Sequence, residues 1–244
     1  MSGALLDAGA ILVPGRLHGL SAHFEPGRIS AICGPNGAGK STLLQVLAGL
    51  IEPAGGEVEL AGAPLPGPRE RARCIGYLPQ AGEVAWDLSV AGLAALGRLP
   101  HGDRNREAVD QALAATGLSA LASRPVSTLS GGERARALLA RVLAGQPQWI
   151  LADEPLAALD LAHQLALLAR FRDAAEAGTG IVLVLHDLTL AMNHADQVWV
   201  LDAGRVAAAG PPEQALAEPV IQRVWGVDAV WLGEPGVRAL ATRR

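Results

Sequence analysis

The residues whose spacing most clearly predicts chemistry form the glycine-rich loop Gly34-Pro35-Asn36-Gly37-Ala38-Gly39-Lys40-Ser41. The loop matches the pattern G-x-x-x-x-G-K-[ST], follows an expected strand at 29–33 and opens an expected helix at 42–48. Its glycines let backbone N–H groups turn toward a phosphate, and the helix N-terminus adds favourable partial charge. We expect Lys40 to reach the β- and γ-phosphates of a nucleotide and the Ser41 hydroxyl to hold Mg²⁺. Kinases, GTPases and transport ATPases share this loop, so it leaves the reaction open; the alternative is a turn that only caps a helix.

Two adjacent carboxylates, Asp153 and Glu154, follow an apolar run at residues 149–152. Such a pair at the end of a strand is costly to bury unless a cation or hydrogen-bond donors accompany it. Because consecutive strand residues point in opposite directions, one carboxylate can serve a metal while the other addresses a water molecule. The pair therefore predicts a site that holds a cation or hydrogen-bond donors, and the alternative is a cap for the segment that follows.

Four further polar sites each have an ordinary structural explanation when taken alone. Ser130 and Glu133 fit a capping box, with serine at the N-cap and glutamate three residues later. Asp160 is equally suited to cap the helix expected after it, at 161–175. A lone Gln80 is typical of a solvated loop, and a lone His186 of a hydrogen-bonded histidine at a strand end. Their order along the chain is what indicates a shared function.

The pattern of apolar residues predicts an α/β fold. Apolar, β-rich runs alternate with helical patterns, which indicates a largely parallel sheet covered by helices. The clearest strands are expected at 29–33, 149–153 and 181–185, and each ends where polar residues begin, which is where such sheets place their ligands. Residues 57–60 alternate polar and apolar, as in an antiparallel strand with one face in water.

The middle of the chain differs from both ends because its β pattern disappears between residues 88 and 121. Helices are expected at 88–97 and 105–116, separated by a break at Pro100-His101-Gly102-Asp103. We interpret residues 81–129 as a helical subdomain inserted into the α/β core.

Taken in order, five segments besides the glycine-rich loop resemble the motifs of the ATP-binding cassette (ABC) ATPase family, over nearly the whole chain. Tyr77-Leu78-Pro79-Gln80 resembles the Q-loop, and Leu129-Ser130-Gly131-Gly132-Glu133 resembles the signature motif. The stretch 149–155 resembles Walker B with its catalytic glutamate, Ala158-Leu159-Asp160 the D-loop and Leu185-His186-Asp187 the switch histidine segment. The resemblance implies a P-loop NTPase (RecA-like) core, residues 1–80 and 130–244. This core carries an N-terminal antiparallel β subdomain and an inserted α-helical subdomain, residues 81–129, with the signature motif at its end.

The resemblance also implies ATP and Mg²⁺ as cofactors and a role for each motif residue in ATP hydrolysis. Asp153 supports Mg²⁺, Glu154 polarises the attacking water and His186 contacts the γ-phosphate. Gln80 senses the metal and the water and links them to the helical insertion. The implied metal residues are Ser41, Gln80 and Asp153, and the implied nucleotide contacts are Asn36, Gly37, Ala38, Gly39, Lys40, Ser41, Thr42, Ser130, Gly131, Gly132 and Asp160.

In this family two cassettes act together. Ser130, Gly131 and Gly132 of one subunit close on the γ-phosphate held by the loop of the other, which implies a head-to-tail homodimer around two ATP molecules. ATP then favours the closed dimer and hydrolysis removes the contact that held it shut. Leu156-Ala157 replaces the Thr or Ser often found before the D-loop, so Asp160 is the candidate for a contact across the dimer.

One departure from the family concerns the base of the nucleotide. Members usually carry an aromatic residue shortly before the P-loop strand, on which adenine stacks, yet residues 1–22 contain no Phe, Tyr or Trp. Only His18 is available to stack there, and Phe24 is expected in the core. We therefore predict that affinity depends mainly on the phosphates and that base discrimination is weak.

A shorter resemblance narrows the family to bacterial importers. Leu88-Ser89-Val90 and residues 96–101 resemble the helical subdomain of the iron-siderophore, haem and vitamin B12 (cobalamin) importers, and the tail through Trp225-Gly226-Val227 resembles importer cassettes. The resemblance implies integral membrane permease subunits, a periplasmic or surface substrate-binding protein acting through them, and a peripheral position on the cytoplasmic face of the inner membrane. Residues 81–101 are the candidates for contact with the permease. The three substrates are not separated by these residues.

Other classes of protein use part of the same motif set. A soluble ABC ATPase, for example of iron-sulfur assembly, or an exporter cassette stays open as an alternative. DNA-repair members carry a long coiled coil between Q-loop and signature, for which residues 80–130 leave no space, and ribosome-acting members usually carry two cassettes. A P-loop small-molecule kinase does not need the signature at 130–133.

Composition limits the possible partners. With a formal net charge of -4, the chain has no overall positive charge that would attract a polyanion, so nucleic acid is not expected as a partner. Cys33 and Cys74 are too few for a disulfide framework, which favours a reducing compartment. No uncharged apolar run approaches the roughly 18 to 20 residues that span a bilayer, and residues 1–14 lack the basic start of a signal peptide. Any membrane role is therefore expected to come through a partner.

Overall fold

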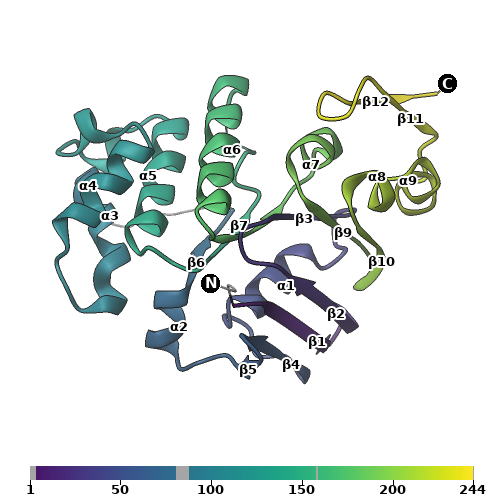
Figure 1. The fold of residues 1–244 in the computed structure, drawn as a ribbon, viewed down its shortest axis with the longest axis horizontal. Helices are drawn as coiled ribbons and strands as arrows, with labels where there is room; N and C mark the ends of the chain where they lie inside the picture. Colours follow the sequence, from purple (N-terminus) through teal and green to yellow (C-terminus); the bar gives the residue numbers. More distant parts are fainter. Residues whose placement is uncertain (1–3, 81–87, 158, 244) are drawn as a thin grey trace.

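A six-stranded sheet forms the centre of the computed structural model, which describes residues 4–80, 88–157 and 159–243. Its strand order is β10-β9-β3-β8-β7-β6, with all neighbours parallel except the antiparallel pair β9 and β10 (Figure 1). The strands are β3 (Ile29–Cys33), β6 (Ile75–Leu78), β7 (Trp149–Asp153), β8 (Gly180–Val184), β9 (Gln197–Asp202) and β10 (Arg205–Gly210). The predicted parallel sheet is confirmed, and the strand expected at 181–185 begins and ends one residue earlier.

Both faces of the central strands β3, β7 and β8 are buried, which explains why these strands are largely apolar. Ile150 and Ala152 of β7 face one core, which contains the buried side of α6 (Leu161–Glu176) and α7 (Leu188–His194). Trp149 and Leu151 face a second core with α1 (Lys40–Leu47). The alternation follows from the two-residue period of a strand.

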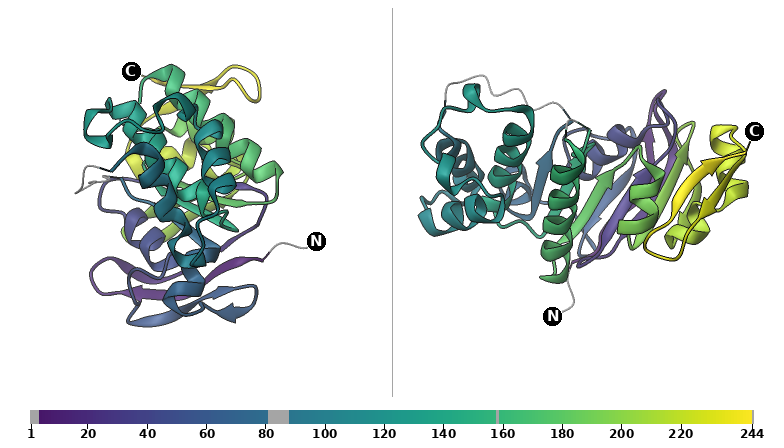
Figure 2. Two further views of the ribbon diagram at one scale, coloured as in Figure 1. Left: turned by 90° about the vertical axis from the view of Figure 1, so that its left-hand side faces the viewer. Right: turned by 90° about the horizontal axis from the view of Figure 1, so that it is seen from above.

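A second sheet has four antiparallel strands in the order β2-β1-β4-β5. They are β1 (Leu6–Val13), β2 (Leu17–Phe24), β4 (Gly55–Leu60) and β5 (Ala63–Pro64). The alternation at 57–60 correctly predicted an antiparallel strand. Helix α1 packs between this sheet and the parallel one, so the two sheets share the core that includes Phe24 (Figures 1 and 2).

The helical region lies at one end of the parallel sheet, beyond the edge strand β6 (Figure 1). It contains α3 (Val90–Ala95), the 3₁₀ helix η1 (Leu96–His101), α4 (Arg106–Ala115), the 3₁₀ turns η2 (Ser119–Leu121) and η3 (Val126–Thr128), and α5 (Gly131–Ala144). The helix expected at 105–116 is confirmed, with Asn105 as its N-cap. The one expected at 88–97 was wrong at both ends. Ser89 caps a helix that starts at Val90, and the chain changes to 3₁₀ at Leu96 before Gly102 ends it in a left-handed conformation.

The division of the chain into a core and an insertion at 81–129 stays a prediction. Residues 81–87 lie outside the described part of the chain. Helix α5 begins just beyond the proposed boundary and packs against α3 and α4 as well as against β6, so it joins the two regions.

The remaining elements are short. Helix α2 (Pro68–Cys74) precedes β6, and α8 (Pro212–Ala215), α9 (Glu218–Trp225) and the hairpin β11 (Ala229–Leu232) and β12 (Ala239–Thr242) follow β10 (Figure 2). Within the described ranges, no helix is both long enough and apolar enough to cross a membrane.

Candidate nucleotide-binding site

The glycine-rich loop connects β3 to α1, and its conformation requires glycine at Gly39. This residue has a φ of 97°, and a Cβ added to it would lie 2.7 Å from Leu17 Cδ2 and 2.9 Å from the carbonyl oxygen of Arg16. Gly39 is also the N-cap of α1 and offers no side chain to the first turn of the helix. The first N–H groups of α1 are therefore left for a ligand, as at other anion-binding helix N-termini.

Lys40 is held inside the loop. Its Nζ donates hydrogen bonds to the carbonyl oxygens of Gly34 and Pro35, each at 2.9 Å. Burial lowers the pKa of the Lys40 ammonium, whereas the nearby charge of Glu154 raises it. The loop carbonyls thus fix the Lys40 ammonium at the centre of the loop.

Ser41 and Asp153 place two oxygen ligands side by side. The Ser41 hydroxyl donates to Asp153 Oδ1 over 3.0 Å, and Asp153 is only 4% exposed. Burial raises the pKa of the Asp153 carboxyl, while the bond from Ser41 lowers it. A cation at this position would favour the ionised carboxylate, and oxygen pairs of this kind suit Mg²⁺.

The side chains of Glu154 and Asp153 point in different directions, but not for the reason that we predicted. We expected the alternation of strand residues to separate the two carboxylates, but β7 ends at Asp153. Glu154 has a φ of 48°, a left-handed conformation that is rare for residues other than glycine. Backbone strain of this kind clusters at functional sites, and here it turns the Glu154 side chain into the pocket.

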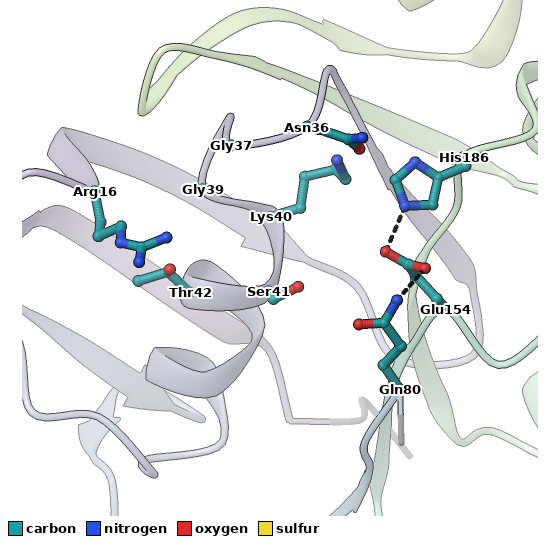
Figure 3. A pocket seen from close by; sticks show the side chains of 10 residues that line it. All are labelled: Arg16, Asn36, Gly37, Gly39, Lys40, Ser41, Thr42, Gln80, Glu154 and His186. Atoms are coloured by element: carbon teal, nitrogen blue, oxygen red, sulfur yellow. Dashed lines mark hydrogen bonds and ion pairs between the residues drawn. The ribbon is translucent and has the colours of Figure 1, made fainter. Parts of the chain in front are cut away.

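Three loops meet at the Glu154 carboxylate. Gln80, after β6, donates from Nε2 to Glu154 Oε2 at 2.5 Å, and His186, after β8, pairs through Nε2 with Glu154 Oε1 (Figure 3). Because β6, β7 and β8 are parallel neighbours, their carboxyl ends bring the three side chains to one edge of the sheet. The carboxylate is held from both sides.

These residues line a cavity of about 580 Å³. Nine of the predicted site residues line it: Asn36, Gly37, Gly39, Lys40, Ser41, Thr42, Gln80, Glu154 and His186. A tenth lining residue, Arg16, was missed by the sequence analysis (Figure 3). The turn Pro14-Gly15 just before it, between two β patterns, was the available indication. His18, the only residue in 1–22 that was available to stack on the base, is not among the described residues that line the cavity.

Six predicted site residues lie elsewhere in the same chain. Asp153 sits buried behind Ser41, and Ala38 is buried with its carbonyl bonded to the N–H of Gly204 at 3.2 Å. The other four, Ser130, Gly131, Gly132 and Asp160, are not among the described residues that line the cavity.

The capping explanations hold for two of these residues. Ser130 and Glu133 form the reciprocal capping box of α5, and the Ser130 N–H lowers the pKa of the Glu133 carboxyl. Asp160 caps α6 by accepting from the His163 N–H at 2.9 Å, and it also pairs with the His163 ring at 2.7 Å. Both residues therefore have structural roles within one chain, whatever they contact in another.

Comparison with known proteins agrees with the geometry of the site. The sequence pattern of the family described as ABC transporter matches residues 17–157. The hemin import ATP-binding protein HmuV of Nocardia farcinica is 48% identical over 206 residues, covering 82% of this chain and 72% of that protein. Its counterpart in Myxococcus xanthus is 45% identical over 230 residues, covering 87% of this chain and 86% of that protein. A solved transporter assigned to the metal-chelate ABC type, in an inward-facing conformation, superposes with a TM-score of 0.83 at 25% identity, over 97% of this chain and 96% of that chain.

Proposed function

Since this chain belongs to the ABC transporter family, as an ATP-binding and ATP-hydrolysing subunit of the importer type, we propose that it powers the uptake of haem into a bacterial cell. The observation that carries this proposal is the identity of 48% and 45% to two proteins named for hemin import. Iron-siderophores and cobalamin are the other substrates that the sequence left open, and the experiment below separates them.

ATP would lie along the P-loop with its γ-phosphate toward Glu154. The support for this orientation is that Lys40, Ser41 and the free first turn of α1 lie beside the Gln80, Glu154 and His186 cluster in one cavity. Ser41 and Asp153 would hold Mg²⁺, with Gln80 near it; bound there, the ion would neutralise charge on the phosphate oxygens. Among the described residues no group of three or more His, Cys, Asp or Glu side chains is placed to hold a metal ion.

Glu154 would orient and polarise the water that attacks the γ-phosphate. Its carboxylate is fixed by Gln80 on one oxygen and His186 on the other, which supports a positioned base. His186 would turn from Glu154 toward the γ-phosphate when ATP binds. Gln80 would report the state of the site to the helical region.

The signature residues Ser130, Gly131 and Gly132 would act on the ATP of a second copy. Their place outside the cavity of their own chain supports this arrangement, and a Cβ added to Gly131 would meet no atom within 4 Å. Asp160 would contribute to the same interface while capping α6. The proposed assembly is thus a homodimer of cassettes around two ATP molecules.

A membrane permease would bind the helical region, and a substrate-binding protein would act through the permease. Of the candidate contact residues 81–101, the described part includes Leu99, which is 69% exposed on the rim of a cavity of about 790 Å³. Exposure of a large apolar side chain beside a groove supports a protein contact. This chain would then sit peripherally on the cytoplasmic face of the inner membrane.

The test begins with affinity purification of the tagged chain from gently solubilised cells and mass spectrometry of its partners. A multi-spanning protein at a near one-to-one ratio is expected, and Leu99→Glu should reduce its recovery, whereas Val237→Glu, equally exposed on the C-terminal hairpin, should not. Recovery of soluble assembly factors without a permease would contradict the importer proposal.

A transport assay then identifies the substrate. The purified permease and this chain, reconstituted in vesicles with the substrate-binding protein, should take up haem in an ATP-dependent way. Uptake of cobalamin or of an iron-siderophore in place of haem would refute the haem assignment while leaving the importer proposal intact.

A further inference from the structure

Arg16 is a charged residue of the cavity for which the proposed hydrolysis mechanism has no use. It lies in the turn between β1 and β2, where its N–H donates to the carbonyl oxygen of Val13 at 2.9 Å. In Figure 3 its side chain extends from this turn toward the P-loop helix, on the side of Thr42. Glu154, His186 and Gln80 lie at the opposite end of the cavity, with Lys40 and Ser41 between.

The turn that carries Arg16 is fixed against the P-loop by its backbone. The Arg16 carbonyl oxygen approaches Gly39 and Gly204 so closely that a Cβ on either would lie 2.9 Å or 2.4 Å from it. The His18 N–H donates to the carbonyl of Gly204 at 3.0 Å, and the Gly204 N–H to that of Ala38 at 3.2 Å. Residue 16 is therefore held at a constant place relative to the loop.

The guanidinium of Arg16, in contrast, has no bonding partner among the described residues. Arg16 is exposed, and its side chain makes no hydrogen bond or ion pair with any residue in the described part of the chain. The other arginine that precedes β3, Arg28, is paired with Glu25 at 2.6 Å. A cation that lines an anion-binding cavity and has no side-chain partner among the described residues is available to a ligand.

We propose that the planar guanidinium of Arg16 lies against the face of the nucleotide base and replaces the aromatic side chain that is absent from this end of the cavity. Guanidinium groups stack on aromatic faces, and the described lining contains no Phe, Tyr or Trp. The inference rests on the proposed orientation of ATP, which puts the γ-phosphate at Glu154 and directs the base to the Thr42 and Arg16 end. A contact with the face of the ring does not distinguish the polar edges of adenine from those of guanine.

Binding of three probes to the full chain tests this assignment. ATP and GTP carry a base, whereas inorganic tripolyphosphate offers the same row of phosphates without one. Arg16→Ala is expected to weaken ATP and GTP about 3- to 10-fold and to leave tripolyphosphate affinity unchanged, because a cation stacked on a ring contributes an attraction of this order. Arg16→Tyr should restore ATP binding without the charge, and Arg28→Ala should change none of the three affinities.

Two results would overturn the proposal. If Arg16→Ala weakens tripolyphosphate as much as ATP and Arg16→Lys restores both, the side chain pairs with phosphate and not with the base. If Arg16→Ala leaves all three affinities unchanged, the base lies elsewhere. Failure of the underlying site assignment would look different, since Lys40→Ala would then bind ATP and tripolyphosphate as tightly as the unaltered chain.

Discussion

The two ends of the nucleotide cavity are built in opposite ways. At the phosphate end six side chains have partners in the protein: Lys40 donates to the loop carbonyls, Ser41 donates to Asp153, and Gln80 and His186 hold Glu154. At the other end Arg16 is fixed through its backbone but has no side-chain partner among the described residues. The difference shows that the site is preorganised at its phosphate end.

Preorganised groups contribute most to binding and catalysis because they do not have to be ordered when the ligand arrives. The phosphate end is arranged in this way for charge and for a water molecule. The Arg16 end has to order a long, flexible side chain, which limits what it contributes. We therefore expect large effects from changes near Glu154 and Lys40 and small effects from changes near the base.

The largest effect is expected from Glu154→Gln. The amide retains the size of the side chain but is a poor base, so kcat should fall on the order of 10²- to 10⁴-fold while ATP still binds. Size-exclusion chromatography with light scattering should then show a dimer that accumulates with ATP. Glu176→Gln, an exposed change at the end of α6, is the matched control. Normal turnover by Glu154→Gln would remove Glu154 from the catalytic role.

Lys40 offers a direct probe of the phosphate end because it is the only lysine in the 244 residues. Burial lowers the pKa of its ammonium, which favours the reactive neutral amine, whereas an exposure of only 6% slows the approach of a reagent. An amine-reactive reagent should label Lys40, and ATP at about 100 times its Kd should slow that labelling by roughly 100-fold. Peptide mass spectrometry measures the labelling, with the α-amino group of the chain as an internal reference. Equal labelling with and without ATP would place the phosphates away from Lys40.

The phosphate end was also the part that the sequence predicted best. Motif spacing predicts the places of Lys40 and Ser41 because a strand, a tight loop and a helix leave few ways to arrange the eight residues of the motif. Gln80, Glu154 and His186 follow three parallel strands, and a parallel sheet brings such positions to one edge. Local spacing therefore predicted Lys40 and Ser41, whereas Gln80 and His186 were assigned only through the order of motifs that the chain shares with the ABC family.

The sequence did not predict the base end of the cavity, because this end is formed by contacts between residues that are far apart in the chain. The turn that carries Arg16 lies close to Gly39 and Gly204, two residues that are distant from it in sequence and that leave no space for a Cβ beside the Arg16 carbonyl oxygen. No local pattern of charge or hydropathy encodes that approach. The left-handed Glu154 was missed for a related reason: surrounding structure imposes a backbone conformation that the residue type disfavours.

A comparison of the variants Gly39→Ala and Gly37→Ala tests whether the turn that carries Arg16 is fixed to the P-loop. Both residues have a positive φ, so alanine should cost each variant about 1–3 kcal/mol in strain. A Cβ on Gly37 would meet no atom within 4 Å, whereas one on Gly39 would press on Leu17 and Arg16. Gly39→Ala should therefore lose about 1–3 kcal/mol more in free energy of unfolding than Gly37→Ala, measured by urea denaturation. Equal losses would mean that the turn with Arg16 yields easily and is not fixed to the loop.

The smallest difference is expected between ATP and GTP. If the base is covered on one face by Arg16 and no buried group hydrogen-bonds its edge, the two nucleotides should differ by less than roughly tenfold in kcat/KM, because strong discrimination requires buried polar partners. The measurement is steady-state phosphate release with each nucleotide by the full chain. Arg16→Ala should lower both values together and keep their ratio.

A strong preference for ATP over GTP would contradict the contrast that we draw between the two ends of the cavity. It would require donors or acceptors at the edge of adenine, and the base end would then be as specific as the phosphate end. A preference that persists in Arg16→Ala would place those groups on other residues. A preference that disappears would make Arg16 a reader of the base edge, because its N–H groups would then distinguish the two purines directly.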